Sequence, residues 1–301
     1  RRVSVSKLRP EDGVIPGPSR SPDASLADVR TDMIRWQRMQ QGWQAWRDRR
    51  ALQRRPIPDA LWRRTLKRFP FLPSHGQDER ALRILCSLFL DRKEFTGAQG
   101  LVVRDDMAVA IAAQACLPIL HLGLEAYDGF VGIVVHPGQV LARRQSMDDD
   151  GIVHEFDEVL SGEMVEGGPV TLSWSDVRAS GASAPSGYNV VIHEFAHVLD
   201  MSNGRLDATP AFPAHLSADR MSGWSDLWQQ AYADFVLEVQ RGQPTLLDPY
   251  AAHAVEEFFA VAVEAFFVAP ASLIHTQPRL YGLLQAYFQQ DPMSYSGLRS
   301  A

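Results

Sequence analysis

One short stretch constrains this chain more than any other. It runs from Val190 to Asp200 and contains His193-Glu194-Phe195-Ala196-His197. On an α-helix, residues four apart differ by about 40° in direction and about 6 Å in rise, so both imidazoles can reach one tetrahedral ion. This H-E-x-x-H arrangement is typical of zinc metalloproteases, in which the glutamate beside the ion acts as the general base. The stretch therefore predicts a helix that binds one Zn²⁺ per chain.

The residues around the motif are apolar on nearly every side of the helix, which is the pattern of a core helix. The alternative interpretation is a buried helix whose two histidines find other partners. Burying polar groups without partners costs free energy, and a metal ion provides a partner for both imidazoles. The pattern favours the metal.

A catalytic zinc site with two histidines needs a third protein ligand, which another segment must supply. The stretch from Val255 to Val268 predicts a very apolar helix that nevertheless carries Glu256, Glu257 and Glu264. Glu257 and Glu264 are seven residues apart and share one face, whereas Glu256 points about 100° away. The spacing leaves Glu257 and Glu264 open as ligands. The alternative is that these glutamates pair with arginines or lie exposed.

Asp200 follows His193 by seven residues. On a regular helix it would lie about 10 Å from His193 along the axis. That is too far for His193, His197 and Asp200 to share one ion. We therefore expect Asp200 to orient His197 rather than to bind the metal.

The composition separates a basic front segment from the rest of the chain. Residues 1–30 are rich in Pro, Ser, Arg and Asp without a hydrophobic period, which predicts disorder. Residues 31–55 predict a basic amphipathic helix that docks on the body, rests on a membrane surface or partner, or, as the weakest alternative, contacts nucleic acid. We expect a peptidase domain over residues 56–292 and a frayed tail over residues 293–301.

The cysteines and the hydropathy bear on the cell compartment. Cys86 and Cys116 are the two cysteines, and both lie in apolar helical patterns rather than in a paired framework. The sequence has no apolar run of about 18 residues and no secretory signal pattern at its start. These features predict a reducing, cytoplasmic setting.

Helical patterns outnumber strand patterns along the chain. The strand patterns cluster between residues 100 and 175, at 100–103, 130–135, 152–160 and 167–174. The last of these precedes the metal helix, and an edge strand there can hold an extended peptide; an ordinary core strand is the alternative. We expect an α+β, zincin-like metalloprotease domain that is mostly helical, with a small mixed or mostly antiparallel sheet.

Several stretches resemble the zinc peptidases of the Mlc titration factor A type. They are Arg55–Trp62, Leu117–Leu120, Gly123–Glu125, Asp128–Phe130, Gly168–Trp174, the H-E-x-x-H motif, Asp248–Ala252, Glu257–Val261, Glu264–Phe267 and Gln290–Pro292. The catalytic region of that family is similar to that of lethal-factor-type metalloproteases, in which a glutamate before Phe-Phe-Ala binds the metal and a tyrosine seven residues earlier assists. The resemblance therefore implies Glu257 as the third ligand and Tyr250 as a catalytic residue. Glu264 then becomes a residue that orients or packs.

The same resemblance implies a cytoplasmic, zinc-dependent peptidase with aminopeptidase-like activity. The namesake of the family also binds Mlc, a transcriptional repressor of sugar uptake. We therefore expect a peptide substrate and, with less support from motifs, an Mlc-like repressor as a partner.

Together these assignments predict a mechanism. His193, His197 and Glu257 hold zinc, Glu194 accepts a proton from a zinc-activated water and passes it to the leaving amine, and Tyr250 donates a hydrogen bond to the developing oxyanion. The alternative is a non-catalytic, zinc-containing binding protein that sequesters a transcription regulator. Structural zinc sites are usually closed by four protein ligands. The sequence offers three candidate ligands together with Glu194 as a candidate general base, which favours the catalytic interpretation.

Overall fold

The computed structural model describes residues 48–54, 56–147, 153–160, 162–164, 168–203, 208 and 218–295. The chain forms two units, residues 1–54 and residues 55–301. In the first unit, residues 48–54 are helical. The rest of the helix expected over residues 31–55 lies outside the described residues, as do the disorder expected over residues 1–30 and the tail from residue 296 onward.

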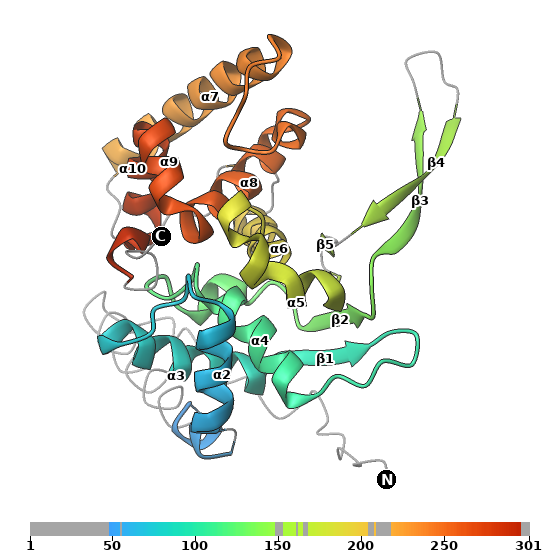
Figure 1. Cartoon of the computed structure of the whole chain (residues 1–301), viewed down its shortest axis with the longest axis vertical. Coiled ribbons are helices and arrows are strands. Elements are labelled where there is room, and N and C mark those ends of the chain that lie inside the picture. The colour runs from blue at the N-terminus through green and yellow to red at the C-terminus, as the bar shows by residue number, and fades with distance from the viewer. Residues whose placement is uncertain are drawn as a thin grey trace, which may run out of the picture. The chain divides into compact units, whose positions relative to one another are not determined.

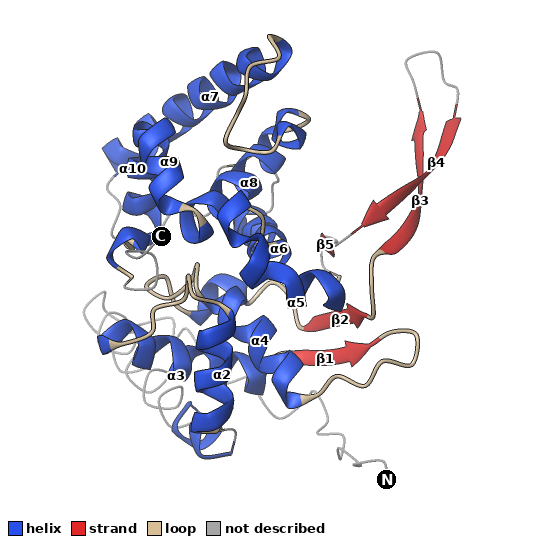
Figure 2. Cartoon of the chain, in the orientation of Figure 1, coloured by secondary structure: helices blue, strands red, loops and turns tan. Residues whose placement is uncertain are grey.

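The second unit is mostly helical, as expected (Figures 1 and 2). Its helices are α2 (Asp59–Arg68), α3 (Gly76–Arg92), α4 (Asp105–Cys116), α5 (Trp174–Ser183), α6 (Val190–Asp200), α7 (Ala218–Gln240), α8 (Val255–Val268), α9 (Pro270–Thr276) and α10 (Pro278–Phe288). Two of them, α5 and α9, are hard to recognise from local sequence patterns. Small residues and glycine obscure the helical period of α5, and α9 begins at the proline that ends α8.

Four strands form one sheet in the order β1-β2-β6-β5. They are β1 (Glu94–Gly97), β2 (Gly132–His136), β5 (Gly162–Met164) and β6 (Val170–Ser173). Strands β1, β2 and β6 run parallel to one another, and β5 runs antiparallel to β6. Of the two expected alternatives, the mixed sheet is found, with mainly parallel strands, and the mostly antiparallel sheet is wrong. The chain leaves β1 and returns through α4 before it enters β2, and a helical crossover of this kind produces parallel strands.

The remaining strands, β3 (Val140–Met147) and β4 (Val153–Leu160), form a separate antiparallel hairpin that extends away from the sheet in Figure 2. The structure decides two local expectations. The strand expected over residues 100–103 is not found: these residues are a turn and loop, and the strand of this region, β1, lies just upstream. Of the two alternatives for the strand before the motif helix, the inner strand is found: β6 lies between β2 and β5, and β5 lies at the end of the sheet, against α6.

Helix α6 occupies the centre of the second unit. It packs against α4 and α8 and against strands β5 and β6. Its Phe195 lies among the rings of Phe89, Tyr127 and Phe130, at centroid distances of 5.8, 5.0 and 5.6 Å. Such aromatic contacts add to the stabilisation from burial alone. The helix that carries the motif is therefore fixed by packing on several sides.

Within the described residues, no single helix is long and apolar enough to cross a membrane. Helices α8 and α9 satisfy the length and composition only when they are taken together, and they meet at a bend of 118°.

Glycine at position 181 allows α5 to approach the end of α2. A Cβ added to Gly181 would lie 2.1 Å from the backbone oxygen of Arg68. We expect Gly181→Ala to lower the free energy of unfolding by about 1–3 kcal/mol through overpacking. Gly282 in α10 is exposed, and no described heavy atom lies within 4 Å of its added Cβ. Gly282→Ala should therefore raise that free energy by up to about 1 kcal/mol through helix propensity.

Urea unfolding of both variants measures this difference. Equal stability changes in the two alanine variants would contradict the close approach of α5 to Arg68.

Candidate metal centre

Asn189 starts the helix that carries the motif. Its Oδ1 accepts a hydrogen bond from the backbone N–H of Ile192 at 3.0 Å, which satisfies one of the free amides of the first helical turn. From this start, α6 turns His193 and His197 to one face, four residues apart. Glu194 lies between them in the chain and is buried, with 5% of its surface exposed.

Three donor atoms from α6 and α8 converge on one point. His193 Nε2 lies 3.2 Å from His197 Nε2, and Glu257 Oε2 lies 3.2 Å from His193 Nε2 and 3.6 Å from His197 Nε2. A tetrahedral zinc ion with ligands at 2.0–2.2 Å separates its ligand atoms by about 3.3 Å. The three residues therefore fit a single metal ion of this size. Among the described residues, they form the group of His, Cys, Asp or Glu side chains that could hold one.

The electrostatics of the site agree with a group built to hold positive charge. Burial alone would lower the pKa of His193, but the charge of Glu264, its hydrogen bond to the ring and the close contact with Glu257 raise it well above the ordinary histidine value. Burial would raise the pKa of Glu257, but its close contacts with His193 and His197 hold it well below the usual range. Glu257 is thus an ionised carboxylate, which is the form that binds a metal.

Glu264 contacts the opposite side of the His193 ring. Its Oε1 lies 2.7 Å from His193 Nδ1, and its other oxygen accepts the backbone N–H of Asn189. The carboxylate is 2% exposed, and its burial raises its pKa despite these contacts. With Glu264 as the partner of Nδ1, Nε2 is the ring nitrogen of His193 that faces the metal position.

Replacement of Glu264 should weaken metal binding without removing a ligand. Glu264→Gln keeps the side-chain volume but removes the charged acceptor for His193 Nδ1–H. Loss of such an outer contact typically costs 10- to 100-fold in metal affinity, and we expect a decrease of about that size. Competition with a chelator measures the affinity. The same substitution at Glu94, which is exposed on β1, is the control and should leave the affinity unchanged; equal affinities of both variants would contradict the role of Glu264.

Tyr250 lies on a short 3-10 turn, η4 (Pro249–Ala252), that packs against α8. Asp248 caps this turn and accepts the backbone N–H of Tyr250 at 2.9 Å. His253 Nδ1 lies 2.7 Å from the backbone oxygen of Tyr250, and the two rings are 5.2 Å apart. The Tyr250 side chain is 42% exposed. It is therefore accessible from solvent on the segment that leads into Glu257.

Asp200 lies at the end of α6 and is fully buried. Its Oδ2 accepts the backbone N–H of Ala208 at 3.0 Å. His197 Nδ1 is buried and has no hydrogen-bond partner among the described residues. In the described part of the chain, no direct hydrogen bond joins Asp200 to His197. The expected role of Asp200 in orienting His197 stays a prediction.

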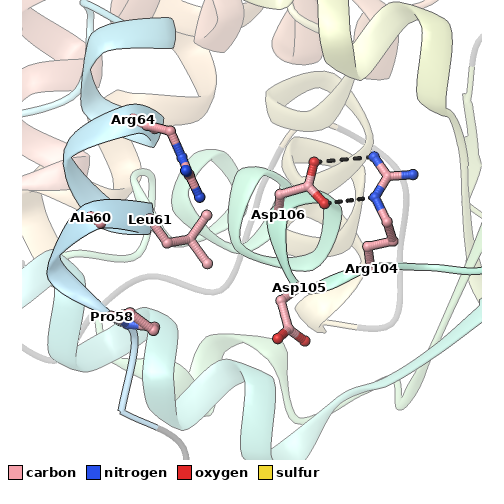
Figure 3. Close-up of a pocket in the computed structure, with 7 residues that line it drawn as sticks. All are labelled: Pro58, Ala60, Leu61, Arg64, Arg104, Asp105 and Asp106. Carbon is pink, nitrogen blue, oxygen red and sulfur yellow. Dashed lines mark hydrogen bonds and ion pairs between the residues drawn. The ribbon is translucent and has the colours of Figure 1, made fainter.

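A separate cavity of about 500 Å³ lies where α2 faces the start of α4 (Figure 3). Its lining includes none of the three converging ligands and consists of Pro58, Ala60, Leu61, Arg64, Arg104, Asp105 and Asp106. Arg104 makes two hydrogen bonds to Asp106 at 2.9 and 3.1 Å, so its charge is already paired within the protein. The cavity is distinct from the metal centre.

Two polar residues near the centre escaped the sequence analysis. They are Gln114 on α4 and Asn189, both fully buried. Each had a local signal: an asparagine directly before an apolar helical run is a typical N-cap, and Gln114 is a lone amide within a long apolar helix. Neither signal points to a metal site without the fold.

Comparisons with known proteins agree with this geometry. Residues 43–289 match the family model described as Glucose-regulated metallo-peptidase M90. An uncharacterized protein of Synechocystis sp. is 33% identical over 254 residues, which are 83% of this chain and 90% of that protein. Proteins named Mlc titration factor A from Pectobacterium atrosepticum and Escherichia coli are each 34% identical. The matches cover 74% and 72% of this chain and 83% and 81% of those proteins. None of these names points to nucleic-acid or membrane contact by residues 1–55.

Proposed function

This chain belongs to the family of glucose-regulated metallopeptidases, M90, and we propose that it is a zinc-dependent peptidase with aminopeptidase-like activity. The observation that carries this proposal is the convergence of donor atoms from His193, His197 and Glu257 at 3.2 to 3.6 Å. Zinc bound there would polarise the scissile carbonyl and lower the pKa of the attacking water toward neutrality.

The remaining chemistry comes from side chains of the protein. Glu194 accepts the proton of the attacking water and passes it to the leaving amine. Its burial beside the ligand histidines supports this role, because a carboxylate shielded from solvent is a stronger base. Tyr250 donates a hydrogen bond to the oxyanion that develops on the scissile carbonyl. Asp200 keeps a proposed orienting role for His197, exerted through the end of α6.

Among the described residues, β5 is the end strand of the sheet and offers a place for the substrate backbone. Among the described strands, β5 pairs only with β6, and it packs against α6. An extended peptide can add to such an edge through main-chain hydrogen bonds. An antiparallel edge strand beside the metal helix also supports assignment of the domain to the zincin-like class.

The test is to measure zinc content and peptide cleavage on the same preparation. We expect about one zinc per chain, and faster cleavage of peptides with a free N-terminus than of the same peptides with an acetylated N-terminus. Equal cleavage of both would replace aminopeptidase-like action with endopeptidase action. A zinc-loaded protein that cleaves none of the peptides would favour the alternative of a non-catalytic binding protein.

We also propose a second function, binding of an Mlc-like transcriptional repressor of sugar uptake, for which the name Mlc titration factor A of two relatives gives the support. We expect such a repressor to bind the wild type and Glu194→Gln equally, because binding does not need turnover. Titration of a labelled repressor tests this.

We also propose a cytoplasmic location, which the free thiols of Cys86 and Cys116 support.

A further inference from the structure

A chain of buried hydrogen bonds leads from α4 to the metal ligand His193. Gln114 Nε2 donates to the backbone oxygen of Ala110 at 3.0 Å. Gln114 Oε1 accepts from Asn189 Nδ2 at 2.9 Å. The backbone N–H of Asn189 donates to Glu264, whose other oxygen lies 2.7 Å from His193 Nδ1. Gln114 and Asn189 are fully buried and Glu264 is 2% exposed, so water does not compete for these contacts.

The first bond of this chain fixes the orientation of both side-chain amides, Gln114 and Asn189. The Ala110 carbonyl can only accept, so Gln114 must turn its NH₂ group toward it and its oxygen toward Asn189. Asn189 must then present its own NH₂ group to Gln114. Its remaining oxygen faces the N–H of Ile192 and caps α6. A carboxylate or a hydroxyl at position 189 could cap the helix equally well, but a carboxylate could not donate to Gln114.

Asn189 therefore has two attachments, one to α6 through Ile192 and one to α4 through Gln114. These attachments fix the position of its backbone N–H, which is the group that holds Glu264. Glu264 in turn holds the ring of His193. A displaced Asn189 backbone would let the Glu264 carboxylate rotate, and the His193 ring would lose the orientation that directs Nε2 at the metal position.

We propose that Gln114 and Asn189 are positioning residues of the metal centre, which act on His193 through Glu264. The inference rests on the proposed function only to the extent that His193 binds a metal. It adds that α4, which supplies no ligand, sets the geometry of one. Helix α4 packs against α6, so the hydrogen bonds connect two elements that are already in contact.

The experiment compares Gln114→Leu and Asn189→Ser with Gln290→Leu. Asn189→Ser keeps a capping oxygen for α6 and loses the amide that reaches Gln114. Gln290 is a matched control, because it is a buried glutamine, 3% exposed, that donates to the Leu117 and Pro118 carbonyls and accepts from Tyr295. It has no part in the chain of hydrogen bonds to His193.

Zn²⁺ affinity is measured by chelator competition, and the visible absorption of the Co²⁺-loaded protein reports the ligand geometry. We expect Gln114→Leu and Asn189→Ser each to weaken Zn²⁺ binding by up to about 10-fold, at the lower limit for outer contacts, and to change the Co²⁺ spectrum. Gln290→Leu should lower the thermal stability while both metal readouts stay as in the wild type. The double variant of Gln114 and Asn189 should bind Zn²⁺ no more weakly than the weaker single variant.

Wild-type metal affinity and spectrum in both single variants would overturn the proposal. So would losses that Gln290→Leu reproduces, because they would reflect general destabilisation. If Gln114→Leu does not fold, Asn189→Ser decides alone. Because both readouts are made without substrate, the positioning role can fail while peptide cleavage stands, and cleavage can fail while the positioning role stands.

Discussion

Glu194→Gln should remove peptide hydrolysis and leave the metal in place. The substitution keeps the shape of the side chain and removes its ability to accept a proton. Loss of a general base typically costs 10²- to 10⁴-fold in rate, and we expect a decrease in kcat of that size. Glu194 contributes no atom to the His193, His197 and Glu257 group, so zinc content and Zn²⁺ affinity should match the wild type. Peptide cleavage and zinc content are measured on the same sample.

Glu94→Gln is the matched control for this variant, because it makes the same change on an exposed position of β1. It should cleave peptides at the wild-type rate. If Glu194→Gln still cleaves peptides at the wild-type rate after repurification, Glu194 is not the general base. Loss of zinc from Glu194→Gln would instead show that the residue holds the site together.

Glu257→Ala should lower the metal affinity more than any change outside the ligand group. It removes one of three donor atoms, so the loss should exceed the about 100-fold upper value for outer contacts. The two histidines would then hold the ion alone, and peptide cleavage should disappear with the metal. Zinc retained after dialysis, together with chelator competition, measures the effect.

The neighbouring residue provides the control. Glu256 lies in the same first turn of α8 and is absent from the group of converging ligands. Glu256→Ala should therefore bind zinc as the wild type does. Wild-type zinc affinity in Glu257→Ala, or an equal loss in both variants, would contradict the assignment of Glu257 as the third ligand. Circular dichroism shows whether each variant retains its helices.

These two variants and Glu264→Gln separate three contributions to one site. Replacing Glu194 changes the cleavage rate and leaves the metal affinity unchanged. Replacing Glu257 removes a metal ligand, and replacing Glu264 lowers the metal affinity through the His193 ring. The order of zinc affinities should be wild type and Glu194→Gln, then Glu264→Gln, then Glu257→Ala. The order follows from the contacts, since the carboxylate of Glu257 lies against both histidines on their Nε2 side.

Much of the fold follows from local patterns. The apolar periods predict most of the long helices, and the Asn189 cap and the apolar run after it define α6. The direction of the sheet does not follow from strand patterns alone. It depends on the return of the chain through α4 between β1 and β2, which requires knowing that these two strands are neighbours.

The sequence by itself determined the pair His193 and His197, because the helical period alone places residues four apart on one face. It could not choose between Glu257 and Glu264 from spacing, because both occupy the same face of α8. The packing of α8 across α6 separates the two: Glu257 lies against Nε2 of His193, and Glu264 lies against Nδ1 of the same ring. The link from Gln114 through Asn189 also belongs to the tertiary structure alone, since only the packed helices bring residues 75 positions apart into hydrogen-bond contact.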